Sequence, residues 1–255
     1  MNLIDSHTHL YLDDFSSDLE EVIQRAEKVG VRKFYMPAID YSHSEALLRL
    51  EAQFPGKCVA MAGLHPCSVK ENFEEELQVI GQMLSRRKFA AIGEAGLDLY
   101  WDQTFVGQQY ESLERQIGWA LQYGLPLVLH TRNAIRETIE VIASHKGKGL
   151  KGIFHCFTGT VEEARQIIGL DFLLGIGGVV TFKNSGLGEV LKDIPLEAMV
   201  LETDSPYLAP VPFRGKRNES SYLPYIARKV AEIKNIAAEE VAEMTTRNAE
   251  ALFVL

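Results

Sequence analysis

Two histidines, His7 and His9, close a short apolar run at residues 3–9. In an extended strand, residues two apart project to the same face, so both imidazoles can reach one cation. Imidazole is a common ligand of divalent metal ions in proteins. Because a chain with seven histidines often contains such a pair by chance, a metal site requires further ligands at matching positions.

The rest of the chain alternates short β-branched or apolar runs with longer amphipathic segments. The runs, which we expect to be strands, occupy residues 3–7, 33–37, 58–64, 90–94, 125–130, 152–155, 172–176 and 199–202. The apolar period of a helix is present at residues 18–29, 74–85, 108–123 and 161–168, and residues from 222 onward predict one or two closing helices.

This alternation of strands and helices predicts a parallel sheet, and eight repeats in 255 residues match a closed (β/α)8 barrel, the TIM-barrel fold. The alternative is an open doubly wound sheet. It loses support because no Gly-x-Gly-x-x-Gly follows the first run and no Walker-type loop occurs. The chain contains no low-complexity linker or internal repeat, so we expect residues 1–255 to form a single domain.

Potential metal ligands stand at or just after the ends of the first, fourth, fifth, sixth and eighth predicted strands. In a barrel, these ends form the face that carries the active site, so we expect the side chains to converge. Four imidazoles and two carboxylates suit two divalent cations, with positions left for water and substrate. The ligand types leave magnesium, manganese and zinc open. The predicted ligands are His7, His9, Glu94, His130, His155 and Asp204.

Several of these residues and their neighbours carry more specific expectations. Glu94 is the natural bridging ligand, and Asp204 would hold one metal and orient or deprotonate the attacking water, so both are predicted to be catalytic. His65 ends the third predicted strand, where we expect substrate contact because two metals do not need a fifth imidazole. Glu202 would point into the barrel, as a partner of a ligand or as a buried structural acid. Cys156 follows a predicted ligand and should point away from it.

Charge and composition narrow the classes of function. The formal net charge of −9 argues against a broad basic surface for nucleic acid, although a single cleft can still attract phosphate. Three scattered cysteines fit reduced thiols. The first residues lack a signal-peptide pattern, and the longest nearly apolar stretch, residues 172–182, is too short to span a bilayer. We therefore expect a cytoplasmic protein with no membrane association and no obligate protein partner.

Motifs spread over essentially the whole chain carry a family resemblance. They lie at residues 4–10 (Ile-Asp-Ser-His-Thr-His-Leu), 63–66 (Gly-Leu-His-Pro), 92–98 (Ile-Gly-Glu-Ala-Gly-Leu-Asp), 126–132, 155–159 (His-Cys-Phe-Thr-Gly), 201–208 (Leu-Glu-Thr-Asp-Ser-Pro-Tyr-Leu), 214–219 and 246–253. In this order they resemble the TatD family of metal-dependent deoxyribonucleases, within the amidohydrolase-type barrels. The resemblance implies a (β/α)8 barrel, two divalent metal ions and a 3'-5' exonuclease acting on single-stranded DNA or DNA ends. Asn133 and Ser220 depart from the family pattern, which has Asp and Pro there, but neither replaces a predicted ligand.

Our hypothesis from these residues is hydrolysis of a phosphodiester bond by a water that the metal ions activate. Arg132 and Arg214 would bind the phosphate. For the stretch 214–217 as a whole, phosphate contact and a solvated surface loop are equally favoured.

Two other hypotheses remain open at this stage. In one, the same water attacks a small-molecule amide or ester, or an aminoacyl carbonyl. In the other, the chain is a non-catalytic scaffold that keeps metal for stability. A groove rimmed by Arg132, Lys183 and Arg214, with an aromatic such as Tyr100, Trp101 or Phe157 free to stack a base, would favour DNA, whereas a closed pocket would favour a small molecule. The alternative for Tyr100 and Trp101 is that they pack under a loop.

Overall fold

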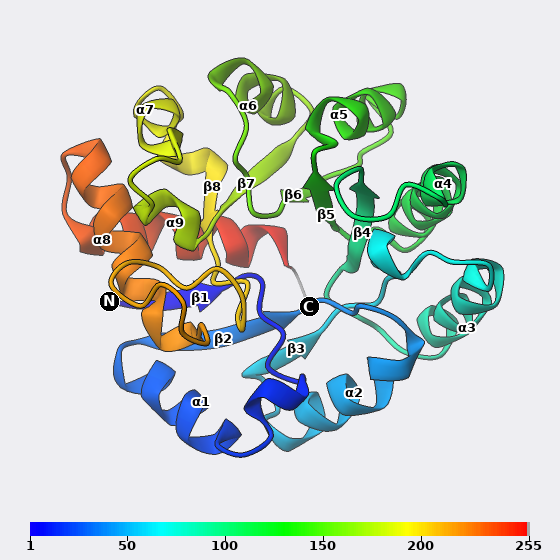
Figure 1. Cartoon of the computed structure of the whole chain (residues 1–255), viewed down its shortest axis with the longest axis horizontal. Helices are drawn as coiled ribbons and strands as arrows, with labels where there is room; N and C mark the ends of the chain where they lie inside the picture. The colour runs from blue at the N-terminus through cyan, green and yellow to red at the C-terminus, as the bar shows by residue number, and fades with distance from the viewer. Residues whose placement is uncertain (254–255) are drawn as a thin grey trace.

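The computed structural model describes residues 1–253 and forms a closed ring of parallel strands surrounded by helices, which confirms the predicted TIM-barrel fold (Figure 1). The strands are β1 (Leu3–Asp5), β2 (Val31–Met36), β3 (Cys58–Ala60), β4 (Ile92–Asp98), β5 (Leu127–Arg132), β6 (Gly152–Phe154), β7 (Phe172–Ile176) and β8 (Met199–Leu201). The α-helices are α1 (Leu19–Lys28), α2 (Ser44–Gln53), α3 (Phe73–Arg86), α4 (Val106–Tyr123), α5 (Ile135–Ser144), α6 (Val161–Ile168), α7 (Leu187–Lys192), α8 (Leu223–Lys234) and α9 (Ala238–Leu252). Short 3-10 turns are η1 (Asp13–Phe15), η2 (Tyr41–His43), η3 (Pro66–Ser68), η4 (Gly178–Thr181), η5 (Leu196–Ala198) and η6 (Ser220–Tyr222).

The ring is built from two sheets that meet at two seams. One sheet has the order β1-β2-β3 and the other β4-β5-β6-β7-β8, with every pairing parallel. At the first seam, Ala62 pairs with Ile92, and at the second, Thr8 pairs with Ser205. The second seam joins the start of the chain to the segment after β8, so residues almost 200 positions apart become neighbours.

Strand bounds differ from the prediction mainly where candidate site residues lie. β1 ends at Asp5, so His7 and His9 follow the strand instead of closing it, and Thr8 between them is held by its bridge to Ser205. β4 continues to Asp98, four residues beyond its predicted end. Runs of apolar residues do not reveal these limits, because hydrogen bonds to neighbouring strands decide where a strand ends.

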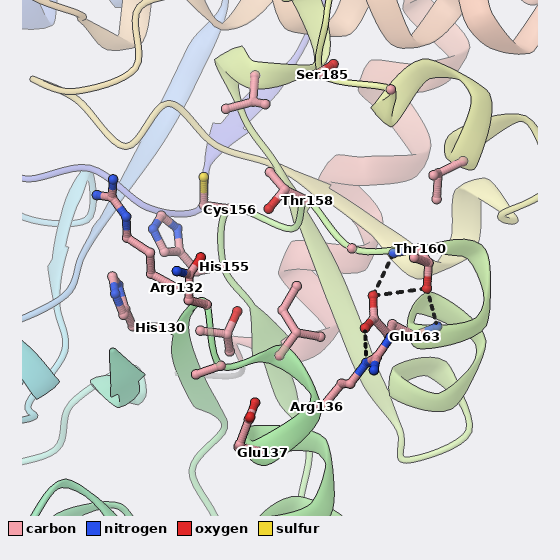
Figure 2. A pocket seen from close by; sticks show the side chains of 18 of the residues that line it. His130, Arg132, Arg136, Glu137, His155, Cys156, Thr158, Thr160, Glu163 and Ser185 are labelled. Carbon is pink, nitrogen blue, oxygen red and sulfur yellow. Dashed lines mark hydrogen bonds and ion pairs between the residues drawn. The ribbon is translucent and has the colours of Figure 1, made fainter. Parts of the chain in front are cut away.

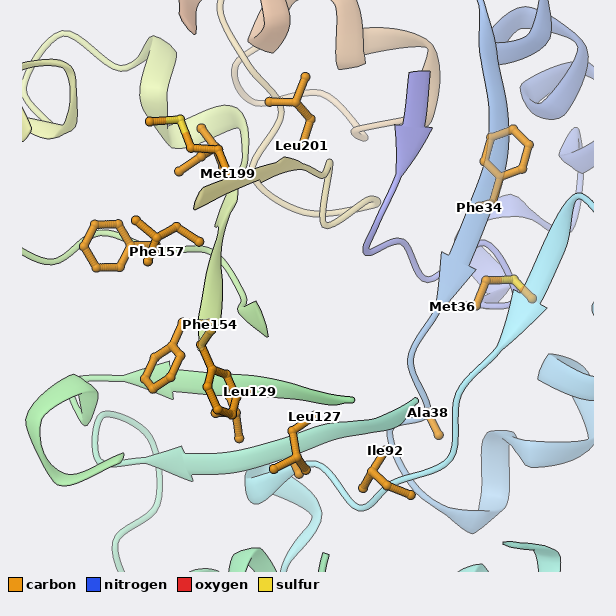
Figure 3. Packing of buried hydrophobic residues seen from close by; sticks show 14 of the residues in the cluster. Phe34, Met36, Ala38, Ile92, Leu127, Leu129, Phe154, Phe157, Met199 and Leu201 are labelled. Atoms are coloured by element: carbon orange, nitrogen blue, oxygen red, sulfur yellow. The ribbon is translucent and has the colours of Figure 1, made fainter. Parts of the chain in front are cut away.

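Two hydrophobic clusters occupy the two faces of the strands. On β5, Leu127 and Leu129 belong to the large cluster between strands and helices (Figure 3). Val128 belongs to a smaller cluster. Side chains alternate along a strand, so His130 shares the inner face with Val128. The same alternation on β6 places His155 on the side of Ile153. Strand periodicity therefore directs both imidazoles inward.

The length and hydropathy of the helices were compared with those of a membrane-spanning helix. None of those within residues 1–253 combines the length and apolar character that crossing a bilayer demands.

Candidate metal centre

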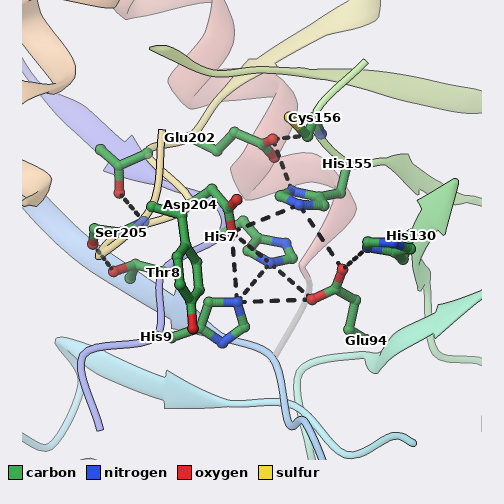
Figure 4. A network of polar contacts seen from close by, with 12 residues as sticks. His7, Thr8, His9, Glu94, His130, His155, Cys156, Glu202, Asp204 and Ser205 are labelled. Atoms are coloured by element: carbon green, nitrogen blue, oxygen red, sulfur yellow. Dashed lines mark hydrogen bonds and ion pairs between the residues drawn. The ribbon is translucent and has the colours of Figure 1, made fainter. Parts of the chain in front are cut away.

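His7, His9 and two acidic side chains meet at the carboxyl end of the barrel (Figure 4). His7 Nε2 lies 3.2 Å from Glu94 Oε2 and 3.7 Å from Asp204 Oδ1. His9 Nε2 lies 3.3 Å from His7 Nε2 and 3.5 Å from the same oxygen of Asp204. Three of these side chains are almost wholly buried, and Asp204 is 14% exposed. The approach of so many nitrogen and oxygen lone pairs within 4 Å is typical of a site that holds a cation.

The second carboxylate oxygen of Glu94 faces the remaining predicted ligands. His130 Nδ1 lies 2.9 Å from Glu94 Oε1, and His155 Nε2 lies 3.9 Å from it. The His155 ring also stacks on the His7 ring with centroids 3.5 Å apart. The structure therefore brings all six predicted ligands together, with Glu94 between the two groups of imidazoles.

Gly96 allows β4 to approach β5 closely at this point. Its φ of +136° lies in a region that favours glycine, and a Cβ atom would stand 2.1 Å from the carbonyl oxygen of His130. The β4–β5 register is also irregular between Ile92 and Ala95, the stretch that contains Glu94. A larger residue at position 96 would separate the strands that carry Glu94 and His130.

Two further acids hold the imidazoles of the centre. His130 Nε2 lies 2.7 Å from Asp98 Oδ2, and since a carboxylate only accepts, this nitrogen donates. His155 Nδ1 lies 2.8 Å from Glu202 Oε1, an ion-pair distance without the alignment of a hydrogen bond. Such partners orient a ligating histidine and leave its other nitrogen free for the metal.

Asp98 was missed by sequence reasoning, although it lies four residues after Glu94, on the same face of β4. Its Oδ1 accepts the backbone N–H groups of Tyr100 and Trp101. For Glu202, the sequence leaves two roles open, a partner of a ligand or a buried structural acid. It is fully buried, and its contact with His155 favours the first role.

The charges of the buried groups call for a cation. Burial opposes ionisation of Glu94, but the neighbouring imidazoles of His65, His7 and His155 hold its pKa well below its usual range. Burial also opposes charge on His155, yet the carboxylates of Glu202, Asp204 and Glu94 raise its pKa to about 10. With the acids ionised, the imidazoles must carry extra protons or share a metal ion.

The lone pairs at His130 support the same conclusion. His130 Nδ1 faces an oxygen of Glu94 while its Nε2 already donates to Asp98, so a neutral ring would set one lone pair against another. A divalent cation between them removes this conflict, and the residues present therefore fit a metal centre.

His65 lies beside this group, where substrate contact was predicted. Its Nδ1 accepts the backbone N–H of Cys67, and its Nε2 lies 3.2 Å from His130 Nδ1 and 3.5 Å from Glu94 Oε1. The sulfur of Cys67 lies within 4.8 Å of ligand atoms on both histidines. No sequence pattern predicts this cysteine here, because it lies in the short 3-10 turn η3.

A cavity of about 1050 Å³ adjoins the centre and receives the predicted substrate residue Arg132 (Figure 2). Arg132, His130 and His155 lie together at one end of it. Cys156 lines the same cavity. The strand ends at Phe154, and Cys156 adopts a positive φ of 48°, so regular strand alternation does not extend to this residue.

The third predicted substrate residue, Arg214, lies outside the main cavity. It lines a neighbouring hollow of about 430 Å³ together with Lys183, and the two cavities share Val179 and Ser185. Arg217, three residues further on, instead donates two 2.7 Å hydrogen bonds to Asp18 near the start of α1. The stretch 214–217 thus contains one cation at a hollow and one in a structural ion pair.

Comparison with known proteins agrees with this geometry. Residues 4–254 match the family model described as TatD related DNase. The chain is 38% identical to the uncharacterized metal-dependent hydrolase YabD of Bacillus subtilis, over 98% of each chain. It is 32% identical to the 3'-5' ssDNA/RNA exonuclease TatD of Pantoea vagans, over 99% of this chain and 100% of the relative.

A solved structure agrees as well. The crystal structure of YjjV, a TatD homologue from Escherichia coli, superposes with a TM-score of 0.93 at 30% identity, covering 99% of this chain and 98% of that one. The match extends over nearly the whole length of both chains. The chain therefore belongs to the TatD-related DNase family and is a metal-dependent hydrolase.

Proposed function

We propose that this hydrolase is a deoxyribonuclease that removes nucleotides from the 3' end of single-stranded DNA. The observation that carries the proposal is a buried set of four imidazoles and two carboxylates beside a cavity whose rim bears arginines. Within residues 1–253, neither Arg132 nor Arg214 forms an ion pair with an acid, so both are free to bind phosphate. We also propose that residues 1–255 act as one catalytic domain.

Two divalent cations would be held by the residues around Glu94. His7, His9 and Asp204 would serve one side, His130 and His155 the other, and Glu94 both. When bound, such ions lower the pKa of water and neutralise charge on phosphoryl oxygens. Magnesium, manganese and zinc all suit this mixed set.

The chain's own residues would supply the remaining chemistry. Asp204 is ionised, because His155, His7 and His9 lower its pKa against the opposing effect of burial, and it is the centre's most exposed carboxylate. It would accept the proton of the attacking water. Arg132 and His65, at the edge of the centre, would bind the phosphoryl oxygens and orient the bond to be cut.

Relatives support a nucleic acid substrate. The family description names a DNase, and the Pantoea vagans relative is named a 3'-5' ssDNA/RNA exonuclease. The arrangement of Arg132, Lys183 and Arg214 around two joined hollows also favours a long anionic substrate over a small amide or ester. Arginines without acidic partners at the rim of the cavity do not favour a non-catalytic scaffold.

The test is hydrolysis of an end-labelled single-stranded oligodeoxynucleotide by purified protein, before and after chelation. Magnesium, manganese and zinc are then restored separately. A ladder that shortens from the 3' end only when metal is present is the expected result. If folded, metal-loaded protein cleaves no nucleic acid but hydrolyses members of an ester and amide panel, the nuclease proposal is wrong.

A further inference from the structure

Exposed aromatic and apolar side chains gather at the carboxyl-end rim of the barrel. Within residues 1–253, six of the nine exposed large apolar side chains lie in the segments that follow β2, β4 or β8. They are Tyr41, Tyr100, Trp101, Tyr207, Leu208 and Val211. Trp101 is 65% exposed and Tyr100 50% exposed, so these rings are not packed beneath their loop. An exposed Trp beside a catalytic centre points to a ligand with a flat apolar face.

Arg132 connects these rings to the metal centre. It stands two residues after His130 on β5 and so projects to the same side of the strand. Its guanidinium carbon lies 4.0 Å from the centroid of the Tyr100 ring and 5.0 Å from that of the Trp101 ring. The two rings are nearly perpendicular, at 84°. A guanidinium stacked on a ring keeps its N–H donors in its own plane, where they can still bind a phosphate.

A second arginine–aromatic pair lies at the adjoining hollow. The Arg214 guanidinium carbon is 3.6 Å from the centroid of the Phe182 ring. Both residues line the 430 Å³ hollow, which shares Val179 and Ser185 with the larger cavity. Two stacked arginines without acidic partners among residues 1–253 therefore stand along one connected depression that begins at the metal centre.

We propose that Trp101, packed edge to face with Tyr100, forms a stacking platform for a base next to the cleaved phosphate of single-stranded nucleic acid. Arg132 would bind the phosphate of the same nucleotide, and the strand would continue over the Phe182–Arg214 pair. This inference rests on the proposed nuclease function and adds to it how the strand is held. Stacking accepts any base, because each base has a π face, whereas paired bases in a duplex do not offer that face.

The acidic charge of the chain favours the platform over a broad electrostatic surface. A net charge of −9 repels a polyanion except at local cationic points, so ring stacking has to supply much of the affinity. The loop that carries the rings is also anchored, because Asp98 accepts both of their backbone N–H groups. The same aspartate holds His130, which ties the position of the platform to that of the centre.

The experiment uses Trp101 as its own reporter. The chain has two tryptophans, so Trp119→Phe leaves Trp101 as the single indole emitter. This variant, loaded with metal, is titrated with a short oligothymidylate whose terminal linkages are phosphorothioates, which slow cleavage. A matching oligoribonucleotide is titrated in parallel. Stacking quenches the emission of Trp101, whereas phosphate contact alone leaves it unchanged.

Variants in the background of the full chain separate stacking from folding. Trp101→Ala should weaken binding about tenfold, the scale of one stacked base, and Trp101→Phe should restore most of the loss. Tyr123→Ala removes another exposed aromatic, at the end of α4, and serves as the matched control with unchanged affinity. Oligonucleotides that lack one base near the 3' end should bind Trp101→Ala and the parent equally.

The outcomes distinguish this inference from the function on which it rests. Quenching with a base-dependent loss in Trp101→Ala supports the platform. Equal binding by parent and Trp101→Ala, or an equal loss with the abasic oligonucleotide, overturns it even if DNA is cut. Absence of cleavage with intact quenching would instead contradict the nuclease proposal and leave the platform supported.

Discussion

Glu94 contacts imidazoles with both oxygens of a buried carboxylate, His7 through one and His130 through the other. Its pKa is held low by three histidines, so it stays ionised at neutral pH. At the residue scale, this side chain decides whether the centre can hold two cations at once. A substitution that removes only the charge of Glu94 tests its bridging role.

We expect Glu94→Gln to lower hydrolysis at least about a hundredfold, because a neutral amide cannot balance two cations. The shape is kept, so the circular dichroism spectrum should not change. Rates with saturating metal are the measurement. Glu163→Gln, in the same cavity but facing Thr160 and Arg136, is the control and should retain activity. Full activity of metal-loaded Glu94→Gln would refute the bridging role.

Asp98 acts through His130 and offers a second test at this scale. Burial opposes its ionisation, but hydrogen bonds from His130 and two backbone amides lower its pKa. In Asp98→Asn, the amide can keep those backbone contacts only by turning its NH₂ toward His130 Nε2. That change favours a proton on His130 Nδ1, the nitrogen that faces Glu94.

Asp98→Asn should therefore weaken metal affinity about 10- to 100-fold, a typical loss for such a partner. Affinity is measured by titration calorimetry with manganese, and activity is then assayed at saturating metal. The control is Asp102→Asn. Asp102 lies in the same loop but contacts Lys70 and Thr104, so this variant should bind metal normally. Unchanged affinity in Asp98→Asn would show that His130 needs no orienting acid.

At the scale of elements, the segment after β8 is held against α1 by a network of charges. Arg217 and Arg25 both donate to Asp18, and Arg25 also donates to Glu219. This network fixes the end of the segment whose beginning carries Asp204 and whose middle carries Arg214. The position of this segment, which spacing in the sequence does not predict, is thereby tied to α1.

The pKa of Asp18 gives this network a pH signature. Hydrogen bonds from Arg217, joined by Arg25, lower it from 3.8 to about 2. A folded-state pKa below the unfolded value means that the stabilisation is present above about pH 4 and is lost as the pH falls toward 2. We expect Asp18→Asn to lower the free energy of unfolding by about 1 kcal/mol at neutral pH, after allowing for screening by solvent.

Urea unfolding of parent and Asp18→Asn over a range of pH measures this difference, which should shrink as the solution becomes acidic. Asp14→Asn is the matched control, because its carboxylate forms no ion pair within residues 1–253 while its backbone carbonyl still accepts Arg217. A constant difference across the pH range would mean that the charge of Asp18 does not stabilise the loop.

At the scale of the whole molecule, the fold does not depend on the metal centre for its core. The large cluster packs helices onto all eight strands, and the small one fills the inside of the barrel below the imidazoles. A chain of this size buries enough apolar surface to fold without metal. Bound metal adds only the stability that binding to the folded state supplies.

Chelation should therefore abolish hydrolysis while leaving the far-ultraviolet circular dichroism spectrum intact. The melting temperature should fall by several degrees and recover when metal is restored. Parallel assays of activity and thermal unfolding check this. Loss of the spectrum at room temperature would show that the buried acids and imidazoles cannot be tolerated without cations and that the metal is structural.

Local sequence patterns are enough to predict the barrel and to select the candidate ligands. Alternating runs are local features, and a parallel barrel always brings strand ends to one rim, so His130 and His155 could be assigned without knowing a single contact. The close pair His7 and His9 was found for the same reason, although both lie beyond the end of β1. Candidate ligands whose positions follow from strand order and alternation can therefore be predicted from the sequence.

The surroundings of those ligands follow from contacts between distant segments. Asp98 meets His130 across 32 positions of the chain, and Arg217 meets Asp18 across 199. No local pattern marks these partners, because each pairing is set by how loops and strands pack in space. The same holds for Trp101, whose exposure beside Arg132 follows from the path of one loop and not from its residue type. Periodicity places a side chain on a face, but contacts between distant segments determine its chemistry.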